Sequence, residues 1–265
     1  MQKGQIYVIT HKPLELAVPE HYQKLYVGAC KLSEKEKQMQ GYAFDDTGDN
    51  ISAKNSNYCE LTGLYWLWKN CSDEIVGICH YRRFFTDANG LLPFAKAEQM
   101  LNDADAIVAK RWWLPGSVQK QFEQRHSRED LQMVRGVIEE CHPKYLGSFD
   151  KAMAKGFMFP YNMMVCRKEI FDGYCAWLFG IMEECEKHLK LAGYDAYQQR
   201  VYGFLSERLW LVYLIHHKLK VAETEVMEQG LSMRVRVGKV LYDILSLNRR
   251  IMDGRLEKKG VPYWE

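Results

Sequence analysis

The sequence lacks the short motifs that mark several large enzyme classes. No GxxxxGK[ST] stretch occurs, which excludes a P-loop nucleotide-binding site. No GxGxxG follows an apolar run, which disfavours a dinucleotide-binding domain, and the GxSxG elbow of the α/β-hydrolases is missing. Asp103 and Asp105 have Asp-x-Asp spacing, but they precede the apolar run 106–109 instead of ending it. A metal role for this pair is left open, and the expectation is that no metal is needed.

Paired cysteines and long apolar runs are also absent. The eight cysteines include no CxxC pair and no Cys/His cluster with zinc-ligand spacing, and most lie in apolar runs, as reduced core cysteines do in the cytosol. The apolar run that follows the N-terminus is too short for a signal peptide or a membrane span. We therefore expect a cytoplasmic protein. Its net charge of +2 argues neither for nor against an anionic partner, and nothing indicates nucleic-acid binding.

Apolar segments alternate between strand-like and helical patterns. Residues 5–10 form a β-branched run, residues 57–70 place apolar side chains at helical spacing, and residues 74–79 form a second apolar run. This order predicts an α/β fold with a Rossmann-like sheet that is mixed but mostly parallel and is flanked by helices. Further strands are expected at 25–30, 104–110, 156–166 and 219–226, and further helices after Ser127 and at 167–191 and 204–218.

The composition changes near residue 231, so we expect one domain over 1–230 and a basic, amphipathic, helical segment over 231–265. In that segment eight basic residues outnumber four acidic ones and alternate with apolar residues. Peripheral contact with an anionic membrane is one interpretation, and an ordinary terminal helix packed on the domain is the favoured one.

The stretch Cys79–Phe85 (CHYRRFF) is the most distinctive part of the chain. It follows a predicted buried strand, and in parallel sheets ligands bind outside the carboxyl ends of strands. Arg82 and Arg83 can grip a diphosphate, because guanidinium groups match phosphate oxygens with paired hydrogen bonds. In a continuous strand His80 and Arg82 would point to one side. The alternative is an arginine pair in structural salt bridges, and the residues alone do not decide between the two.

Polar residues interrupt three other apolar segments. Glu60 lies in a helical pattern and needs a partner, which a structural ion pair would also supply. Glu207, beside Arg208, has the chemistry of a general base, although an early glutamate also compensates a helix dipole. Asn162 is a donor and an acceptor that suits sugar hydroxyls, or else a turn residue.

Aromatic residues make up 13% of the chain, which slightly favours a carbohydrate ligand, since sugars stack on flat apolar faces. Trp112 and Trp113 are candidates for stacking an acceptor sugar. The alternative is a surface anchor for the loop that ends at Pro115 and Gly116.

Taken together, these segments resemble the DUF4422 family of capsular and exopolysaccharide glycosyltransferases. The resemblance extends over roughly residues 5–226, and its most specific part is a glutamate followed by Leu-Tyr-Trp and then His-Tyr-Arg-Arg. The segments that carry it are 6–12 (IYVITHK), 49–52 (DNIS), 57–70 (NYCELTGLYWLWKN), 76–85 (VGICHYRRFF), 159–163 (FPYNM) and 204–209 (FLSERL).

The resemblance implies a GT-A-like fold, in which His80-x-Arg82 occupies the place where many relatives carry Asp-x-Asp. A cationic side chain would then replace a divalent metal in neutralising the departing diphosphate. The implied donor is a nucleotide-diphospho-sugar, with UDP and galactose as the first choice. The implied acceptor is a lipid-linked or soluble glycan in bacterial capsule, exopolysaccharide or O-antigen synthesis.

The implied roles follow from these positions. The catalytic residues would be Glu207 as the base, Arg208 orienting it, and His80. The donor would be bound by Thr10, His11, Glu60, Arg82, Arg83 and Asn162, and the acceptor by Trp112 and Trp113. Two other functions stay open: a non-catalytic module that binds a nucleotide sugar or glycan on the same fold, and a phosphate-ester hydrolase that uses His80.

Overall fold

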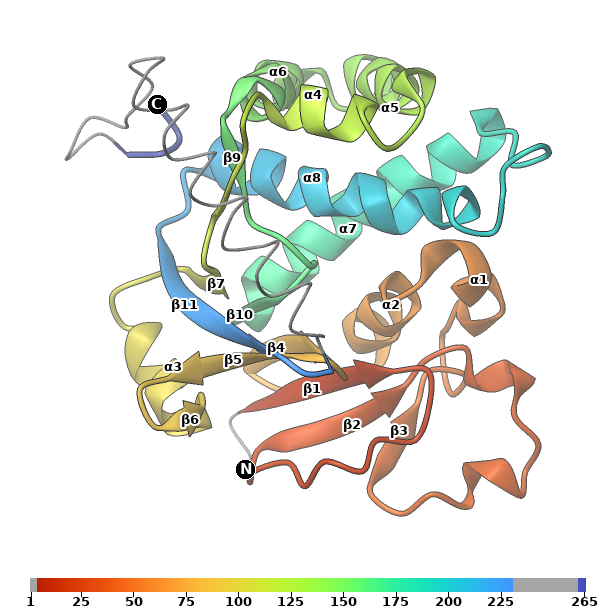
Figure 1. The fold of residues 1–265 in the computed structure, drawn as a ribbon, viewed down its shortest axis with the longest axis vertical. Helices are drawn as coiled ribbons and strands as arrows, with labels where there is room; N and C mark the ends of the chain where they lie inside the picture. Colours follow the sequence, from red (N-terminus) through yellow and green to blue (C-terminus); the bar gives the residue numbers. More distant parts are fainter. Residues whose placement is uncertain (1–3, 231–261) are drawn as a thin grey trace.

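The computed structural model describes residues 4–230 and 262–265, which form a mixed α/β fold (Figure 1). The basic segment predicted over 231–265 lies almost wholly outside these residues, so its helical character stays a prediction. One half of the main sheet is parallel, with strand order β3-β2-β1-β4. Its strands are β1 (Gly4–Thr10), β2 (Tyr22–Tyr26), β3 (Tyr42–Phe44) and β4 (Ile75–His80).

The other half of the sheet is mainly antiparallel and continues in the order β10-β7-β11-β5-β6. Its strands are β10 (Met164–Arg167), β7 (Ala106–Ala109), β11 (Val221–Glu228), β5 (Arg83–Asp87) and β6 (Gly90–Leu91). β7 and β11 pair in parallel, but β10 is antiparallel to both of its neighbours. The sheet is therefore mixed, and the expectation of a mostly parallel sheet holds only for the first half. One reason is the two-residue turn after β4, which forces β5 to return antiparallel as a hairpin.

Alternating side chains place a separate apolar core on each face of the sheet. Tyr7 and Ile9 of β1 face the larger core with the long helices, and Ile6 and Val8 face a smaller core. The larger core lies under α2 (Leu61–Asn70), α7 (Lys168–His188) and α8 (Val201–His217), and the smaller one under α3 (Phe94–Met100). Both faces are covered, as expected for strands that read as continuous apolar runs.

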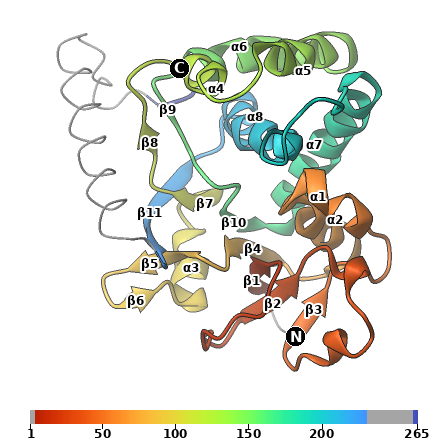
Figure 2. The ribbon, with the colours of Figure 1, turned by 45° about the vertical axis from the view of Figure 1, so that its right-hand side comes forward.

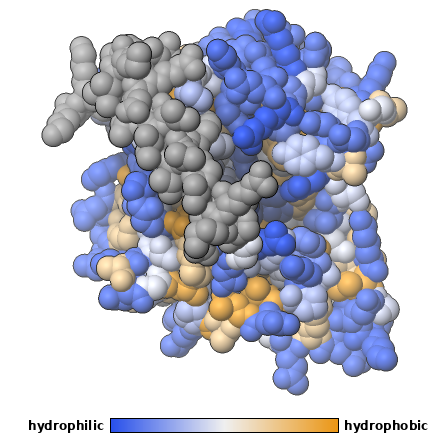
Figure 3. All heavy atoms as spheres, viewed as in Figure 1, coloured by the Kyte–Doolittle hydropathy of each residue, from blue (hydrophilic) through white to orange (hydrophobic). Residues whose placement is uncertain are grey.

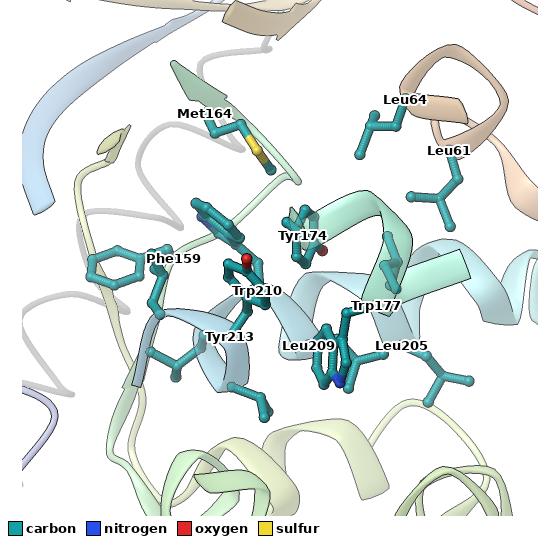
Figure 4. Packing of buried hydrophobic residues seen from close by; sticks show 14 of the residues in the cluster. Leu61, Leu64, Phe159, Met164, Tyr174, Trp177, Leu205, Leu209, Trp210 and Tyr213 are labelled. Carbon is teal, nitrogen blue, oxygen red and sulfur yellow. The ribbon is translucent and has the colours of Figure 1, made fainter. Parts of the chain in front are cut away.

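Helix α8 is the central helix of the molecule, because nearly every residue from Val201 to Ile215 is buried. Aromatic side chains fill the space between α7 and α8, where Tyr174 packs edge-on against Trp210 with ring centroids 4.7 Å apart (Figure 4). An outer layer covers these helices and consists of α4 (Val118–Glu123), α5 (Arg128–Cys141) and α6 (Leu146–Ala154). A polar residue in α8 therefore has little access to solvent unless a cavity reaches it.

The helix α1 (Asn55–Tyr58) lies beside α8 (Figure 2), and the short 3-10 turn η5 (Gln198–Arg200) also contacts α8. In the part of the chain that the structure describes, no helix is long and apolar enough to cross a membrane. Hydrophilic side chains dominate the helical upper part of the face drawn in Figure 3, and hydrophobic ones gather lower, over the sheet.

Three predicted elements have different bounds in the structure. The strand expected at 25–30 ends at Tyr26, because Gly28 adopts a left-handed φ of 70° and a 3-10 turn follows. The helix expected at 57–70 is broken at Cys59, whose φ is 53°. The strand expected at 156–166 is two strands, β9 (Phe157–Met158) and β10, separated by a turn at Tyr161 and Asn162.

Candidate active site

A cavity of about 530 Å³ opens at the carboxyl ends of β1 and β4, beside the first turns of α8. This is the edge of the sheet at which the sequence predicts a site. Seven of the predicted site residues line it: Thr10, His11, Glu60, His80, Arg82, Arg83 and Glu207. The structure therefore brings together residues from β1, from the β4–β5 hairpin, from the break between α1 and α2, and from α8.

The β4–β5 hairpin does not arrange its arginines as a continuous strand would. His80 is the last residue of β4 and pairs with Arg83, the first residue of β5, whereas Arg82 lies in the turn between them. Cross-strand partners share a face, so His80 is grouped with Arg83 and the expected His80–Arg82 grouping is wrong. The guanidinium of Arg82 lies 5.0 Å from the ring centre of Tyr81, and that of Arg83 lies 4.2 Å from the ring centre of Tyr161.

Arg200, from η5, is a third arginine on the cavity wall. Its Nε donates a 3.1 Å hydrogen bond to the Sγ of Cys59. Within residues 4–230 and 262–265, none of the three cavity arginines forms an ion pair. Among the described residues, the alternative of a structural salt bridge is therefore not realised for Arg82 or Arg83, and the cavity wall carries positive charge that a ligand can neutralise.

Both histidines of the cavity are held neutral. Burial, with a smaller effect of Arg83, lowers the pKa of His80 to about 3, and its Nε2 is buried without a hydrogen-bond partner in the described structure. Burial, Lys12, Arg82 and Arg200 lower the pKa of His11. Neutral imidazoles at these positions act as hydrogen-bond donors or acceptors instead of cations.

Glu60 lies at the start of α2 and is held from behind by Asn162. The Nδ2 of Asn162 donates to Glu60 Oε1 at 2.7 Å and to Ser206 Oγ at 2.8 Å. Asn162 is only 1% exposed and does not line the cavity, so its contact with the site passes through Glu60. The carboxylate is thereby fixed against Gly203, whose Cβ position would be 3.8 Å from Glu60 Oε2.

Glu207 faces the cavity from the second turn of α8, one turn after Gly203. The first turn of α8 contains no acidic residue, so compensation of the helix dipole does not account for Glu207. Arg208, 3% exposed, donates to Glu207 Oε2 at 2.9 Å, to the carbonyl of Phe204 at 2.7 Å and to Gln121 Oε1 at 2.5 Å. Arg208 lies behind the cavity wall, where it holds the glutamate in place.

Burial raises the pKa of Glu207, and this effect outweighs the opposing effect of Arg208. The nearby charge of Glu60 raises it further, whereas Arg83 and a hydrogen bond from the backbone of Tyr161 act in the opposite direction. A carboxylate with a raised pKa is a stronger base, which is the property that a general base needs.

The backbone around the site is strained at non-glycine residues. Tyr161 and Asn162 have φ values of 81° and 52°, and Cys59 has a φ of 53°. Such conformations are costly and persist only where the surrounding structure fixes them, often beside functional groups. Here they orient Asn162 toward Glu60, the Tyr161 ring toward Arg83 and the Cys59 thiol toward Arg200.

Trp112 and Trp113 lie outside this cavity. They form β8 (Trp112–Trp113), which pairs with β9 in a separate two-stranded sheet, and the guanidinium of Arg125 lies 6.0 Å from the ring centre of Trp112. The structure does not bring them to the other predicted residues, so their acceptor role stays a prediction.

The cavity combines guanidinium groups, which suit a diphosphate, with two carboxylates. Asp105 accepts a hydrogen bond from the backbone of Lys220 away from the cavity, and the described residues contain no cluster of three or more His, Cys, Asp or Glu placed to hold a metal. Three guanidinium groups line the cavity, and its two carboxylates are already held by Asn162 and Arg208.

Sequence reasoning missed Arg200, Tyr81 and Cys59 as cavity residues. Arg200 lies more than a hundred positions from the hairpin, and only its place directly before an apolar helix signals a helix terminus that faces a ligand. Tyr81 stands between His80 and Arg82, and its ring packs edge-on against His11 with centroids 5.0 Å apart.

Comparison with known proteins identifies a family and a similar fold. No curated protein matches the chain. Among solved structures, the apo structure of the bifunctional glycosyltransferase WbbM is similar, with 28% sequence identity and a TM-score of 0.76 over 87% of this chain. The match covers 46% of the WbbM chain, so this chain spans about half the length of that protein. The similarity supports the GT-A-like fold. The family model described as a domain of unknown function, DUF4422, matches residues 5–218, and the chain therefore belongs to the DUF4422 family.

Proposed function

We propose that this protein is a glycosyltransferase that moves a hexose from a nucleotide-diphospho-sugar to a glycan hydroxyl in polysaccharide synthesis. The observation that carries the proposal is the cavity itself, in which three arginines that form no ion pair with any described residue share one space with two anchored carboxylates, Glu60 and Glu207. The arginines are suited to bind a diphosphate, and a carboxylate is needed to activate the acceptor hydroxyl. The similarity to WbbM, a bifunctional glycosyltransferase, supports the same class of reaction.

The chemistry would proceed in one displacement at the anomeric carbon. Glu207 accepts the proton of the acceptor hydroxyl, the acceptor oxygen bonds to the anomeric carbon, and the bond from that carbon to the phosphate oxygen breaks. The electron pair stays on the diphosphate, whose charge the arginines neutralise. Glu60 would hold a hydroxyl of the donor sugar, and Thr10 and His11 would line the nucleotide end.

The donor, the acceptor, the metal requirement and the location are proposed from the chemistry of the cavity and from the family resemblance. A UDP-linked galactose is the proposed donor, and a lipid-linked or soluble glycan for capsule, exopolysaccharide or O-antigen synthesis is the proposed acceptor. Transfer is proposed to need no divalent metal, because guanidinium groups stand where a metal would neutralise the diphosphate. A cytoplasmic site, with peripheral membrane contact through residues 231–265, remains part of the proposal.

The experiment is a screen of nucleotide sugars, first by thermal shift and then by turnover with candidate glycans, each with EDTA or with Mn²⁺. The true donor raises the thermal midpoint by mass action. Turnover that persists in EDTA is expected, and Arg82→Ala should reduce donor affinity whereas Arg128→Ala should not. Turnover abolished by EDTA and restored by Mn²⁺ would refute metal independence. Tight binding without any transfer would favour a binding module, and phosphate release from an aryl phosphate would favour a hydrolase.

A further inference from the structure

Arg82 and Arg83 are neighbours in the sequence but serve different parts of the cavity. Arg82 lies in the hairpin turn over the ring of Tyr81, which itself packs against His11. Arg83 lies in β5 over the ring of Tyr161, across the hairpin from His80. Because each guanidinium is held against a different ring, the two are not arranged as one fork.

Arg200 reaches the same cavity from the helical side. It ends η5, directly before α8, and its guanidinium is fixed by the hydrogen bond from Nε to Cys59 Sγ. Cys59 is itself rigid, because its carbonyl accepts hydrogen bonds from Asn55 Nδ2 at 2.7 Å and from Thr62 Oγ1 at 3.2 Å. Burial raises the pKa of the Cys59 thiol, so the sulfur stays uncharged and does not itself neutralise Arg200.

The electrostatics group Arg200 with Arg82. Both line the cavity together with His11 at the end of β1, and both lower the pKa of His11. Glu60 in turn raises the pKa of Arg200, whereas Arg83 acts on His80 and on Glu207.

We propose that Arg82 and Arg200 form a clamp across the cavity that grips the diphosphate of a nucleotide from two walls, with Cys59 positioning Arg200. Arg83 is then the cation at the reacting end, beside Glu207. The proposal rests on the proposed donor class but not on transfer itself. Arg200 is thus a binding residue and Cys59 a positioning residue, and the adjacent residues Arg82 and Arg83 have different roles.

The test measures the affinity of the intact protein for UDP and for inorganic pyrophosphate by titration calorimetry. Arg82→Gln and Arg200→Gln should each weaken UDP binding about 10–100-fold, the range for losing a charge-assisted hydrogen bond. The double variant should lose less than the product of the two single effects, because the clamp needs both arms. Arg83→Gln should lower turnover more than it lowers UDP affinity. Arg128→Gln, which removes an arginine outside the cavity, should change neither quantity.

The role of Cys59 has its own readout. Cys59→Ala should weaken UDP binding in the same direction as Arg200→Gln, and Cys59→Ser should retain the wild-type affinity, since a hydroxyl also accepts from Nε. In the Arg200→Gln background, Cys59→Ala should have no further effect. Circular dichroism of each variant establishes that it is folded.

The outcomes separate this proposal from the proposed function. Wild-type UDP affinity in folded Arg200→Gln protein, or failure of the wild type to bind either UDP or pyrophosphate, would overturn the clamp. Additive losses in the double variant would overturn the cooperation of the two arms. If the clamp variants behave as expected but no nucleotide sugar is ever turned over, the clamp stands and glycosyl transfer is refuted.

Discussion

Two cavities of nearly equal volume differ in whether their arginines are paired with carboxylates. The cavity at the end of β4 measures about 530 Å³, and a second one among α4, α5 and α6 measures about 540 Å³. The second is lined by Arg128 and Arg135 together with their carboxylate partners Glu123 and Asp150. In the first, Arg82, Arg83 and Arg200 line the wall without ion pairs among the described residues.

The difference shows how charge marks a site where volume does not. An arginine beside its own carboxylate is satisfied and gains little from an anion, whereas an arginine held over an aromatic ring keeps its charge available. In the first cavity two buried polar residues, Asn162 and Arg208, also hold two carboxylates in place by hydrogen bonds. The second cavity has no such support in the described structure and is the natural control.

The largest expected effect is on turnover in Glu207→Gln. Removing the base should reduce the turnover rate by about 10²–10⁴-fold, the range for general base catalysis, while UDP affinity changes little. The matched control is Glu123→Gln, which removes a carboxylate from the second cavity and should leave turnover unchanged. Turnover near the wild-type rate in folded Glu207→Gln protein would reject the assignment of the base.

The next effect is on stability in Arg208→Met. This change leaves a partly buried carboxylate and the Gln121 amide without their partner, which should cost about 3–5 kcal/mol of unfolding free energy. Denaturant unfolding measures it. Adding Glu207→Gln should recover part of the loss, because no buried charge then remains unpaired. A double variant as unstable as the single one would show that Arg208 acts by packing alone.

The sequence allowed β1, β4 and the helices α5, α7 and α8 to be predicted, because their apolar periodicity is strong. The strand β2 was predicted too far along the chain, and β3, which is short and lies in a polar stretch, was not predicted. The sequence also placed the site, since polar residues directly follow a buried strand. The reversal of β10 was not predictable, because an apolar run has no direction of its own. The turn after β4, which places Arg82 outside the strand, was not predictable either.

The parts of the site that were missed depend on tertiary contacts. The only local signal at Arg200 is its place directly before an apolar helix, and its contact with the cavity appears only when η5 packs beside Cys59. Glu207 has a local alternative as a dipole-compensating residue, which only the observed start of α8 at Val201 removes. Trp112 and Trp113 were predicted to stack an acceptor sugar because they are adjacent aromatic residues, yet they pair with β9, away from the cavity.

A smaller effect is expected on the pH dependence of the reaction. A general base must be deprotonated, so the rate should fall as the pH falls through the pKa of Glu207, which lies above the usual value for a glutamate. The charge of Glu60 contributes to that rise. Glu60→Gln should therefore move the acidic limb of the rate profile to lower pH, while the glutamine oxygen still accepts from Asn162. A profile of kcat/KM against pH measures this shift. An acidic limb that stays at the same pH would show that the charge of Glu60 does not act on the base.

The smallest effect is expected in the second cavity, where the paired charges should matter little. Arg135 and Asp150 form a two-point ion pair, with Nε to Oδ1 at 2.8 Å and Nη2 to Oδ2 at 2.9 Å, but both side chains are substantially exposed. Solvent screens such a pair, so Arg135→Gln should cause no resolvable change in thermal midpoint, UDP affinity or turnover. The same loss of one arginine at position 82 or 200 should be plainly visible in UDP affinity. If Arg135→Gln weakened UDP binding as strongly, unpaired charge would not distinguish the two cavities, and the acceptor or donor would have to be sought among α4, α5 and α6 as well.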